Sequence, residues 1–236
     1  MTLPEPRQRG RRLVPDGDLP DWMRPLAARV DGRPLPARLR HAMGAAPDRA
    51  RRSAVLMLLG EGPSGPDLLL TGRAATLRSH AGQPAFPGGA LDPGEDAVAG
   101  ALREGREETG LDPDSVTPVA VLPELYLRPS GYLVRPVLGY WRRPGPVRVM
   151  DPAETSVVAR VPVSELADPA NRGTVRLPQG LRTPAFTVAG LVVWGFTAGL
   201  VDLLLDWGHW SVPWDLDRPV MLADPPWNSP AQRAAR

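Results

Sequence analysis

Residues 86–111 read FPGGALDPGEDAVAGALREGREETGL, and this stretch decides much of the fold. Its second half predicts one helix with clear ends. Asp92 is expected as the N-cap, Pro93 as the first helical residue, and Glu95 as the acid of a capping box. Gly110 is expected to close the helix in a left-handed conformation. The stretch therefore predicts a loop that leads directly into a short, well-capped helix.

The predicted helix has two unlike faces. At 3.6 residues per turn, Val98, Leu102 and Thr109 fall on one side, with Gly105 between them. We expect this side to pack on a sheet. Glycine at position 105 costs the helix about 1 kcal/mol relative to alanine, but it also permits close packing.

Three acidic residues, Glu104, Glu107 and Glu108, cluster on the opposite side. One interpretation is a solvated face on which Arg103 pairs with Glu107 one turn later. The other is a metal site, because carboxylates about 6 Å apart repel by roughly 3 kcal/mol per pair at an effective dielectric near 20. Closely set oxygen ligands are those that Mg²⁺ prefers. The spacing alone favours neither interpretation.

The surroundings of the acidic cluster resemble the Nudix box of the Nudix hydrolases. Gly89 is followed after five residues by Glu95, and after seven more by REGREETGL at 103–111. The seven specified residues of that pattern are present, as is its second apolar position at Leu111. Gly105 occupies the first apolar position and is a departure. The resemblance favours the metal site.

A second motif precedes the box. LLTGR at 69–73, six further residues, and HAGQPAFPGG at 80–89 are similar to the segment found before the box in coenzyme A diphosphatases, a Nudix subfamily. Pro84 stands where that subfamily usually has an aliphatic residue. The resemblance therefore implies a coenzyme A or acyl-CoA substrate, split into 4′-phosphopantetheine and adenosine 3′,5′-bisphosphate.

This loop supplies groups that suit a nucleotide diphosphate: cations, an imidazole, an amide and glycines that permit close backbone approach. The expected substrate-binding residues are Arg73, Arg78, His80, Gln83 and Phe86. Each has a structural alternative. Arg78 can face solvent, and His80, Gln83 and Phe86 can hold the shape of the loop.

The resemblance also implies the fold, which is α/β (α+β): a mixed β-sheet sandwiched between helices, with the box as a strand-loop-helix unit. The implied ligands of Mg²⁺ or Mn²⁺ are the carbonyl of Gly89 and the carboxylates of Glu104, Glu107 and Glu108. The bound metal would neutralise the diphosphate and help to deprotonate a water.

The remaining catalytic roles are expected from the same resemblance. Arg103 would orient a carboxylate through a charge-assisted hydrogen bond. Glu107 is either a third metal ligand or the general base. Glu154 is a secondary candidate for an acid that approaches the metal, with a plain surface acid as its alternative.

Composition narrows the class of protein. The 236 residues include no cysteine, which excludes disulfides and zinc-thiolate sites. No run of 18 apolar residues and no signal-peptide pattern occurs, so we expect a cytoplasmic protein without a membrane partner. The net charge of +2 is carried by arginine without any lysine, and it makes a nucleic-acid partner an unfavoured interpretation. The basic residues of the first 16 positions predict a frayed tail, with a nucleic-acid-binding arm as the alternative.

Three regions are expected: a tail with short packed helices at 1–49, the Nudix domain at 50–222 and a tail at 223–236. The tyrosines of the 125–132 loop, Tyr126 and Tyr132, are candidates for stacking on adenine, with packing as the alternative. Strands are predicted at 53–59, 67–73, 116–122, 133–141 and 157–161, a hairpin at 175–177 and 184–188, and a strand that becomes a helix near Phe196 within 192–207.

Two other functions stay open. One is a Nudix hydrolase of ADP-ribose or of oxidised nucleoside triphosphates, against which the loop at 69–89 argues. The other is a Nudix-fold binding or regulatory protein without catalysis, against which the intact acidic cluster argues. Monomer and homodimer are equally compatible with the sequence.

Overall fold

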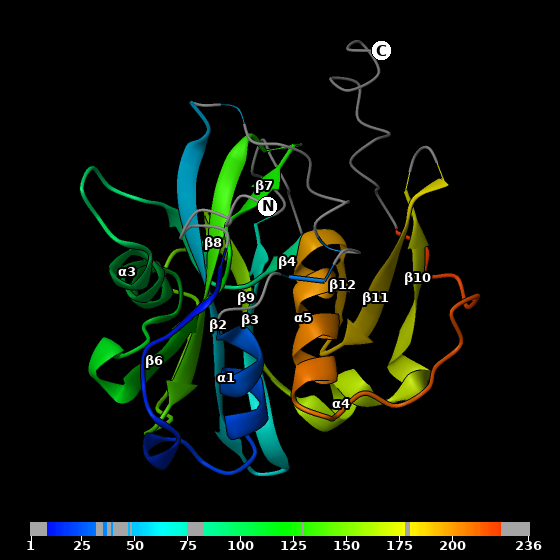
Figure 1. Ribbon diagram of the computed structural model, residues 1–236. Coiled ribbons are helices and arrows are strands. Elements are labelled where there is room, and N and C mark those ends of the chain that lie inside the picture. Colours follow the sequence, from blue (N-terminus) through cyan, green and yellow to red (C-terminus); the bar gives the residue numbers. More distant parts are fainter. Residues whose placement is uncertain are drawn as a thin grey trace, which may run out of the picture.

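The computed structural model (Figure 1) describes residues 9–31, 35–36, 39, 47, 49–74, 83–128, 130–177 and 180–222. Within these residues the chain forms a nine-stranded sheet, a separate three-stranded sheet and flanking helices. The expected mixed sheet between helices is confirmed. The large sheet contains β1 (Arg11–Arg12), β2 (Arg51–Gly62), β3 (Gly65–Arg73), β4 (Pro84–Ala85), β5 (Gly88–Ala90), β6 (Val116–Val121), β7 (Leu125–Leu127), β8 (Tyr132–Trp141) and β9 (Thr155–Pro162).

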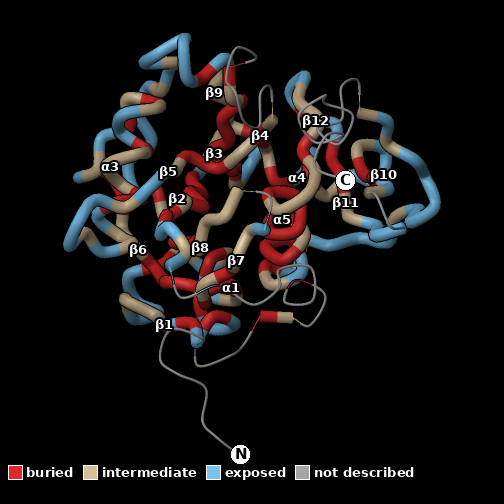
Figure 2. The backbone as a smooth tube through the Cα atoms, turned by 90° about the horizontal axis from the view of Figure 1, so that it is seen from above, coloured by how far each residue is buried: buried red, intermediate tan, exposed pale blue. Residues whose placement is uncertain are grey.

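Strand β2 is the centre of this sheet. It runs parallel to β8 along its length, forms a hairpin with β3, and pairs its first half with β5. Its apolar run is continuous because both of its faces are covered. Leu56 and Leu58 pack in a cluster that includes Ala101 of α3 (Ala97–Thr109), while Met57 and Leu59 pack in the larger core with α1 (Arg24–Val30) and α5 (Gly195–Trp207). Figure 2 shows this buried interior between the helices.

Helix α3 begins later than the sequence predicts. The N-cap is Asp96, whose carboxylate accepts hydrogen bonds from the amides of Val98 and Ala99. The predicted N-cap at Asp92 is wrong, because residues 92–95 form a turn that precedes the helix. Glu95 does bond back to the Asp92 amide, as a capping-box acid would, but it does so within that turn.

The C-terminal end of α3 agrees with the prediction. Gly110 has a φ of 72° and closes the helix through its amide. The close approach expected at Gly105 is also confirmed, because a Cβ there would lie 3.1 Å from Leu56 and 3.2 Å from Leu111. The helix therefore lies directly on β2, which fixes the height of its acidic side chains above the sheet.

Part of the N-terminal region forms regular structure where the sequence predicted a frayed tail. Arg11 and Arg12 form β1 and pair with Val121 and Ala120 of β6, so the prediction of a tail over residues 1–16 is wrong at these positions. An expected short helix is confirmed as α1. Residues 1–8 and His41 lie outside the described residues.

The C-terminal region forms the small three-stranded sheet and helix α5, which together make a second layer. The predicted hairpin is confirmed, and a third strand extends it into a small antiparallel sheet. The change from strand to helix occurs at Gly195, whose φ of 64° favours glycine. The loop expected at 125–132 contains β7, which pairs with β8. The remaining elements are β10 (Arg172–Arg176), β11 (Arg182–Val188), β12 (Leu191–Trp194), α4 (Val163–Ala167) and the short 3₁₀ helices Asp16–Asp18, Pro113–Ser115 and Pro169–Asn171.

Candidate active site

Two carboxylates of α3 point at the backbone of β5. A Cβ on Gly89 would lie 2.4 Å from Oε1 of Glu104, so only glycine leaves room for that carboxylate. The amide of Gly88 donates a hydrogen bond of 3.3 Å to Oε2 of Glu108. A Cβ on Gly88 would also lie 2.3 Å from the Ala54 carbonyl, because β5 pairs closely with β2. The two glycines therefore let sheet, loop and helix converge at one point.

Arg103 organises the acids around this point. Its guanidinium bonds both oxygens of Glu95 at 2.9 Å, Oε1 of Glu104 at 3.0 Å and Oε2 of Glu107 at 3.1 Å. It also donates to the carbonyl of Ala90 at the end of β5. Arg103 thus joins the helix, the preceding turn and the strand, and it lowers the pKa of Glu95 to about 2.

The acids are not equivalent. The pKa of Glu108 is raised to about 7, mainly by burial and also by the charges of Glu104 and Glu154, while the Gly88 amide and Arg73 oppose the change. Burial also raises the pKa of Glu104, against its bond to Arg103. The side chain of Glu107 is 58% exposed and turns toward Arg103. Glu104 and Glu108 are therefore the more buried pair, and Glu107 lies at its exposed rim.

Glu154 reaches the same place from another part of the chain. Its carbonyl accepts from the Ala74 amide at 2.8 Å, just before β9 pairs with β3. Its charge raises the pKa of both Glu104 and Glu108. The strand pairing thus brings Glu154 beside the α3 acids, which sequence spacing alone did not establish.

The second motif frames the acidic cluster. Strand β4 pairs with the end of β3, and the amide of Arg73 donates to the Gln83 carbonyl at 3.1 Å. Arg73 acts electrostatically on Glu108. Phe86 is 2% exposed and packs in the larger core, which favours its structural alternative, support of the loop, while its contact with substrate stays a prediction. Arg78 and His80 lie outside the described residues.

The two tyrosines of the 125–132 segment differ in surroundings. Arg51 lies over the ring of Tyr132, 4.6 Å from its centroid. Tyr126 pairs with Leu133 in the β7–β8 ladder. Stacking on adenine remains a prediction for both.

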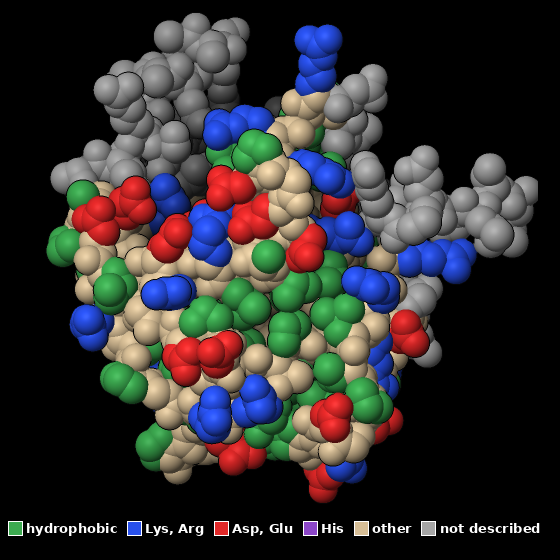
Figure 3. Space-filling model, turned by 90° about the vertical axis from the view of Figure 1, so that its left-hand side faces the viewer, with side chains coloured by type: hydrophobic (Ala, Val, Ile, Leu, Met, Phe, Trp, Pro, Cys, Tyr) green, Lys and Arg blue, Asp and Glu red, His purple; other side chains and the backbone are tan. Residues whose placement is uncertain are grey.

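The oxygen-rich cluster suits a hard divalent cation in its donor chemistry. Glu104 and Glu108 are half-buried acids whose pKa values are raised first by burial and then by neighbouring carboxylates, so an added cation would favour their charged forms. In the described ranges no three His, Cys, Asp or Glu side chains form a ready-made metal-binding group. Figure 3 shows acidic and arginine side chains intermixed on the face of the molecule that carries α3.

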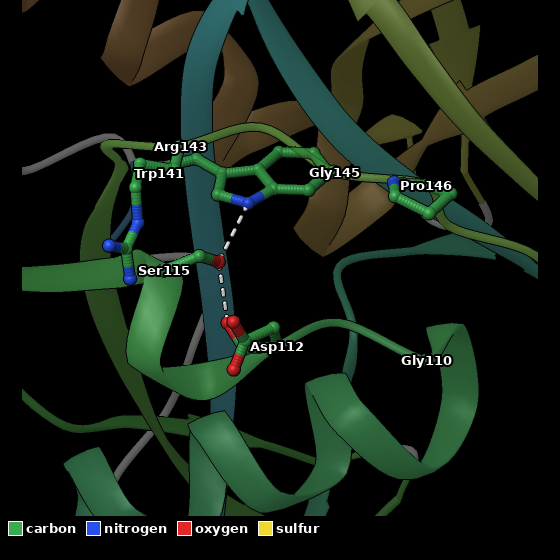
Figure 4. A pocket seen from close by; sticks show the side chains of 7 residues that line it. All are labelled: Gly110, Asp112, Ser115, Trp141, Arg143, Gly145 and Pro146. Carbon is green, nitrogen blue, oxygen red and sulfur yellow. Dashed lines mark hydrogen bonds between the residues drawn. The ribbon is translucent and has the colours of Figure 1, made fainter.

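A cavity of about 280 Å³ lies elsewhere, beyond the C-terminal end of α3 (Figure 4). Its polar groups bond to one another: the Trp141 indole donates to Ser115 Oγ at 2.9 Å, and this hydroxyl donates to the Asp112 carbonyl. The acids of α3 do not line it. The lining residues are Gly110, Asp112, Ser115, Trp141, Arg143, Gly145 and Pro146.

One contact at the site had no signal in the sequence. Thr197, at the start of α5, donates a hydrogen bond to the carbonyl of Pro84 in β4. The two residues are 113 positions apart, so no local pattern connects them. The two hydrogen bonds from Arg103 to Glu95 were also not predicted, although both residues belong to the box motif.

Comparison with known proteins identifies the family. Residues 49–178 match the family model described as NUDIX domain. The chain is 38% identical over 161 residues to "Uncharacterized Nudix hydrolase NudL" of Photorhabdus laumondii, covering 66% of this chain and 84% of that protein. It is 37% identical over 155 residues to the protein of the same name from Escherichia coli K12, covering 64% and 79%.

Among solved structures, a Nudix hydrolase from M. smegmatis, RenU, is similar with a TM-score of 0.43 and 24% identity, over 50% of this chain and 74% of that one. None of the helices in the described part of the chain has the length and apolar character needed to span a bilayer. The family model covers more than half of the chain, and the matched range contains helix α3 with its acids and the loop before it. The chain therefore belongs to the Nudix hydrolase family, whose members hydrolyse nucleoside diphosphates linked to another moiety.

Proposed function

We propose that the protein is a coenzyme A or acyl-CoA diphosphatase that releases 4′-phosphopantetheine and adenosine 3′,5′-bisphosphate. The observation that carries the proposal is the pairing of β3 with β4. It brings the two halves of the second motif, 69–73 and 83–89, side by side next to the acids of α3. A diphosphate held by this loop would thus lie beside the acidic cluster.

The proposed metal ligands are Glu104, Glu107 and Glu108, with the carbonyl of Gly89, and the proposed ion is Mg²⁺ or Mn²⁺. Support comes from the oxygen donor set and from the raised pKa values of Glu104 and Glu108. When bound, the ion would supply positive charge to the diphosphate and lower the pKa of a water.

The protein groups have separate proposed roles. Arg103 holds Glu104 and Glu107 in place through its two hydrogen bonds from Nη1. Where Glu107 is not the third metal ligand, it accepts the proton of the attacking water, and Glu154 is the second candidate for this role because its charge acts on Glu104 and Glu108. No covalent bond between protein and substrate is needed, since water attacks phosphorus directly.

The proposed substrate contacts are Arg73, Arg78, His80 and Gln83. Arg73 is favoured by its proximity to Glu108, which puts a cation at the edge of the acidic cluster. A guanidinium there would pair with phosphate oxygens, a charge-assisted contact. We propose residues 50–222 as the catalytic unit.

A substrate panel tests the proposal. Purified protein with Mg²⁺ or Mn²⁺ is given coenzyme A, acetyl-CoA, ADP-ribose, NADH, a diadenosine polyphosphate and oxidised dGTP, and the products are separated by chromatography. We expect adenosine 3′,5′-bisphosphate from coenzyme A, with loss of the activity in EDTA. Turnover of ADP-ribose without turnover of coenzyme A would overturn the substrate assignment, and the loop at 69–89 would then serve structure. Metal binding without turnover of any substrate would favour a binding protein.

A further inference from the structure

Helix α5 reaches back into the loop that frames the acidic cluster. The hydroxyl of Thr197, in its first turn, donates a buried hydrogen bond of 3.1 Å to the carbonyl of Pro84. Thr197 is 7% exposed. Figure 2 shows β4 lying between β3 and the layer formed by α5 and the small sheet. A residue outside the matched family region, 49–178, therefore contacts the site loop.

Strand β4 needs such support because it is short. It has two residues, and its first is a proline, which has no amide hydrogen to donate to a neighbouring strand. Pro84 faces Gly72 in the β3–β4 ladder. Its carbonyl is thus its one backbone hydrogen-bonding group, and Thr197 is the donor that meets it.

The next carbonyls along the loop are also held. The Thr71 hydroxyl donates to the Ala85 carbonyl at 3.4 Å, and the Leu56 amide donates to the Pro87 carbonyl at 2.8 Å. One residue further, the amide of Gly88 donates to Glu108. Pro84 is therefore the first of several anchored positions in the loop that leads, four residues later, to the amide bonded to Glu108.

We propose that Thr197 is a positioning residue for the active site, which acts by fixing Pro84 and through it the loop from Gln83 to Gly88. The proposal rests on the proposed site but not on coenzyme A as the substrate. The C-terminal layer would then complete the site rather than merely pack behind it. The hydroxyl is the group that matters, because it donates the hydrogen bond to Pro84, which the methyl group of Thr197 cannot do.

Matched variants isolate the hydroxyl. Thr197→Val keeps the shape and removes the donor, Thr197→Ala removes donor and methyl group, and Thr197→Ser keeps the donor. Thr187→Val, at an exposed position of β11 in the same layer, is the control. A buried carbonyl left without its donor loses a net hydrogen bond and its solvation, which corresponds to about a five- to tenfold effect.

The first measurement is hydrogen exchange of the unliganded protein. We expect faster exchange of the amides at 83–90 in Thr197→Val and Thr197→Ala, with β2 unchanged, and wild-type exchange in Thr197→Ser and in the control. The second is kinetics on coenzyme A, in which KM should rise about five- to tenfold in the two variants without the hydroxyl while kcat changes less than twofold. A merely structural role would lower the active fraction, and thus kcat, at constant KM.

The outcomes separate the two proposals. Wild-type exchange at 83–90 in Thr197→Val would overturn the positioning role, as would failure of both hydroxyl-free variants to fold while Thr197→Ser folds. Absence of coenzyme A turnover in the wild type would instead overturn the proposed function. In that case the exchange result alone still decides the role of Thr197.

Discussion

Two arginines of this protein are surrounded by opposite kinds of environment. Arg172, in β10, has a side chain that is 0% exposed, pairs with Asp202 of α5, and lies over the rings of Phe186 and Trp214 at 5.0 and 4.6 Å. Arg172 thus combines an ion pair with contacts to two aromatic rings. This group, the Arg172 cluster, connects Trp214 and helix α5 to the small sheet.

Arg103 is 28% exposed and meets Glu95, Glu104 and Glu107, with Glu108 nearby. Here negative charge exceeds positive charge, and burial raises the pKa of the innermost acid. A protein gains no stability from such an excess. The difference indicates that the Arg172 cluster stabilises the fold, whereas the Arg103 cluster has the excess of carboxylates that the proposed metal site needs.

The largest expected effect falls on catalysis. We expect Glu107→Gln to lower kcat about 10²- to 10⁴-fold, the range for loss of a proton acceptor, without changing the melting temperature, because its side chain is 58% exposed. Steady-state kinetics and thermal melts measure both quantities. Glu165→Gln, at an exposed acid of α4, is the control. Near-normal turnover of Glu107→Gln together with a large loss in Glu154→Gln would move the proton-acceptor role to Glu154.

The opposite pattern is expected at the Arg172 cluster. Asp202→Asn removes the carboxylate that pairs with the buried Arg172, which should lower the free energy of unfolding by about 3–5 kcal/mol in urea melts. The kcat per folded molecule should stay unchanged. The matched control is Asp217→Asn, which breaks the exposed Arg182–Asp217 pair and should cost less than ~1 kcal/mol. Equal losses in both variants would contradict the comparison.

A pH series sharpens the difference further. Burial raises the pKa of Glu108 from 4.5 to about 7, so the folded state binds this proton more tightly than the unfolded state. The stability it contributes is fully present below pH 4.5 and is lost as the pH rises through 7, by up to ~3 kcal/mol. Glu108→Gln should lack this loss. Melts of both proteins from pH 4.5 to 8, without divalent metal, measure it, and parallel curves would refute the assignment.

The smallest effect is expected at Glu95. Its pKa is lowered to about 2 by its bonds to Arg103, so its contribution to stability is present above pH 4.5 and is lost as the pH falls toward 2. At pH 7, Glu95→Gln should cost about 1 kcal/mol and lower kcat less than tenfold, because Glu104 and Glu107 still hold Arg103. A loss of kcat as large as in Glu107→Gln would make Glu95 part of the catalytic group.

Much of this molecule was predictable from local patterns. The apolar run of β2, the left-handed cap at Gly110 and the acid spacing of α3 are all set by neighbours within a few residues. The N-cap was predicted at Asp92 and lies at Asp96. Both aspartates are followed by a residue that can begin a helix, Pro93 and Ala97, so the local sequence fits either position. The strand β7 was missed because its pairing with β8 comes from the sheet and not from its own three residues.

By itself, the sequence determined the helix, its acids and the glycines beneath them, since each of these follows from backbone geometry over one or two turns. Only the tertiary structure decided which acids are buried, because burial of Glu108 depends on the approach of β5. It also decided that Glu154 and Thr197 reach the same site, through β9 and α5 respectively. Such contacts join residues tens of positions apart, and long-range packing leaves no periodic trace in the chain that forms it.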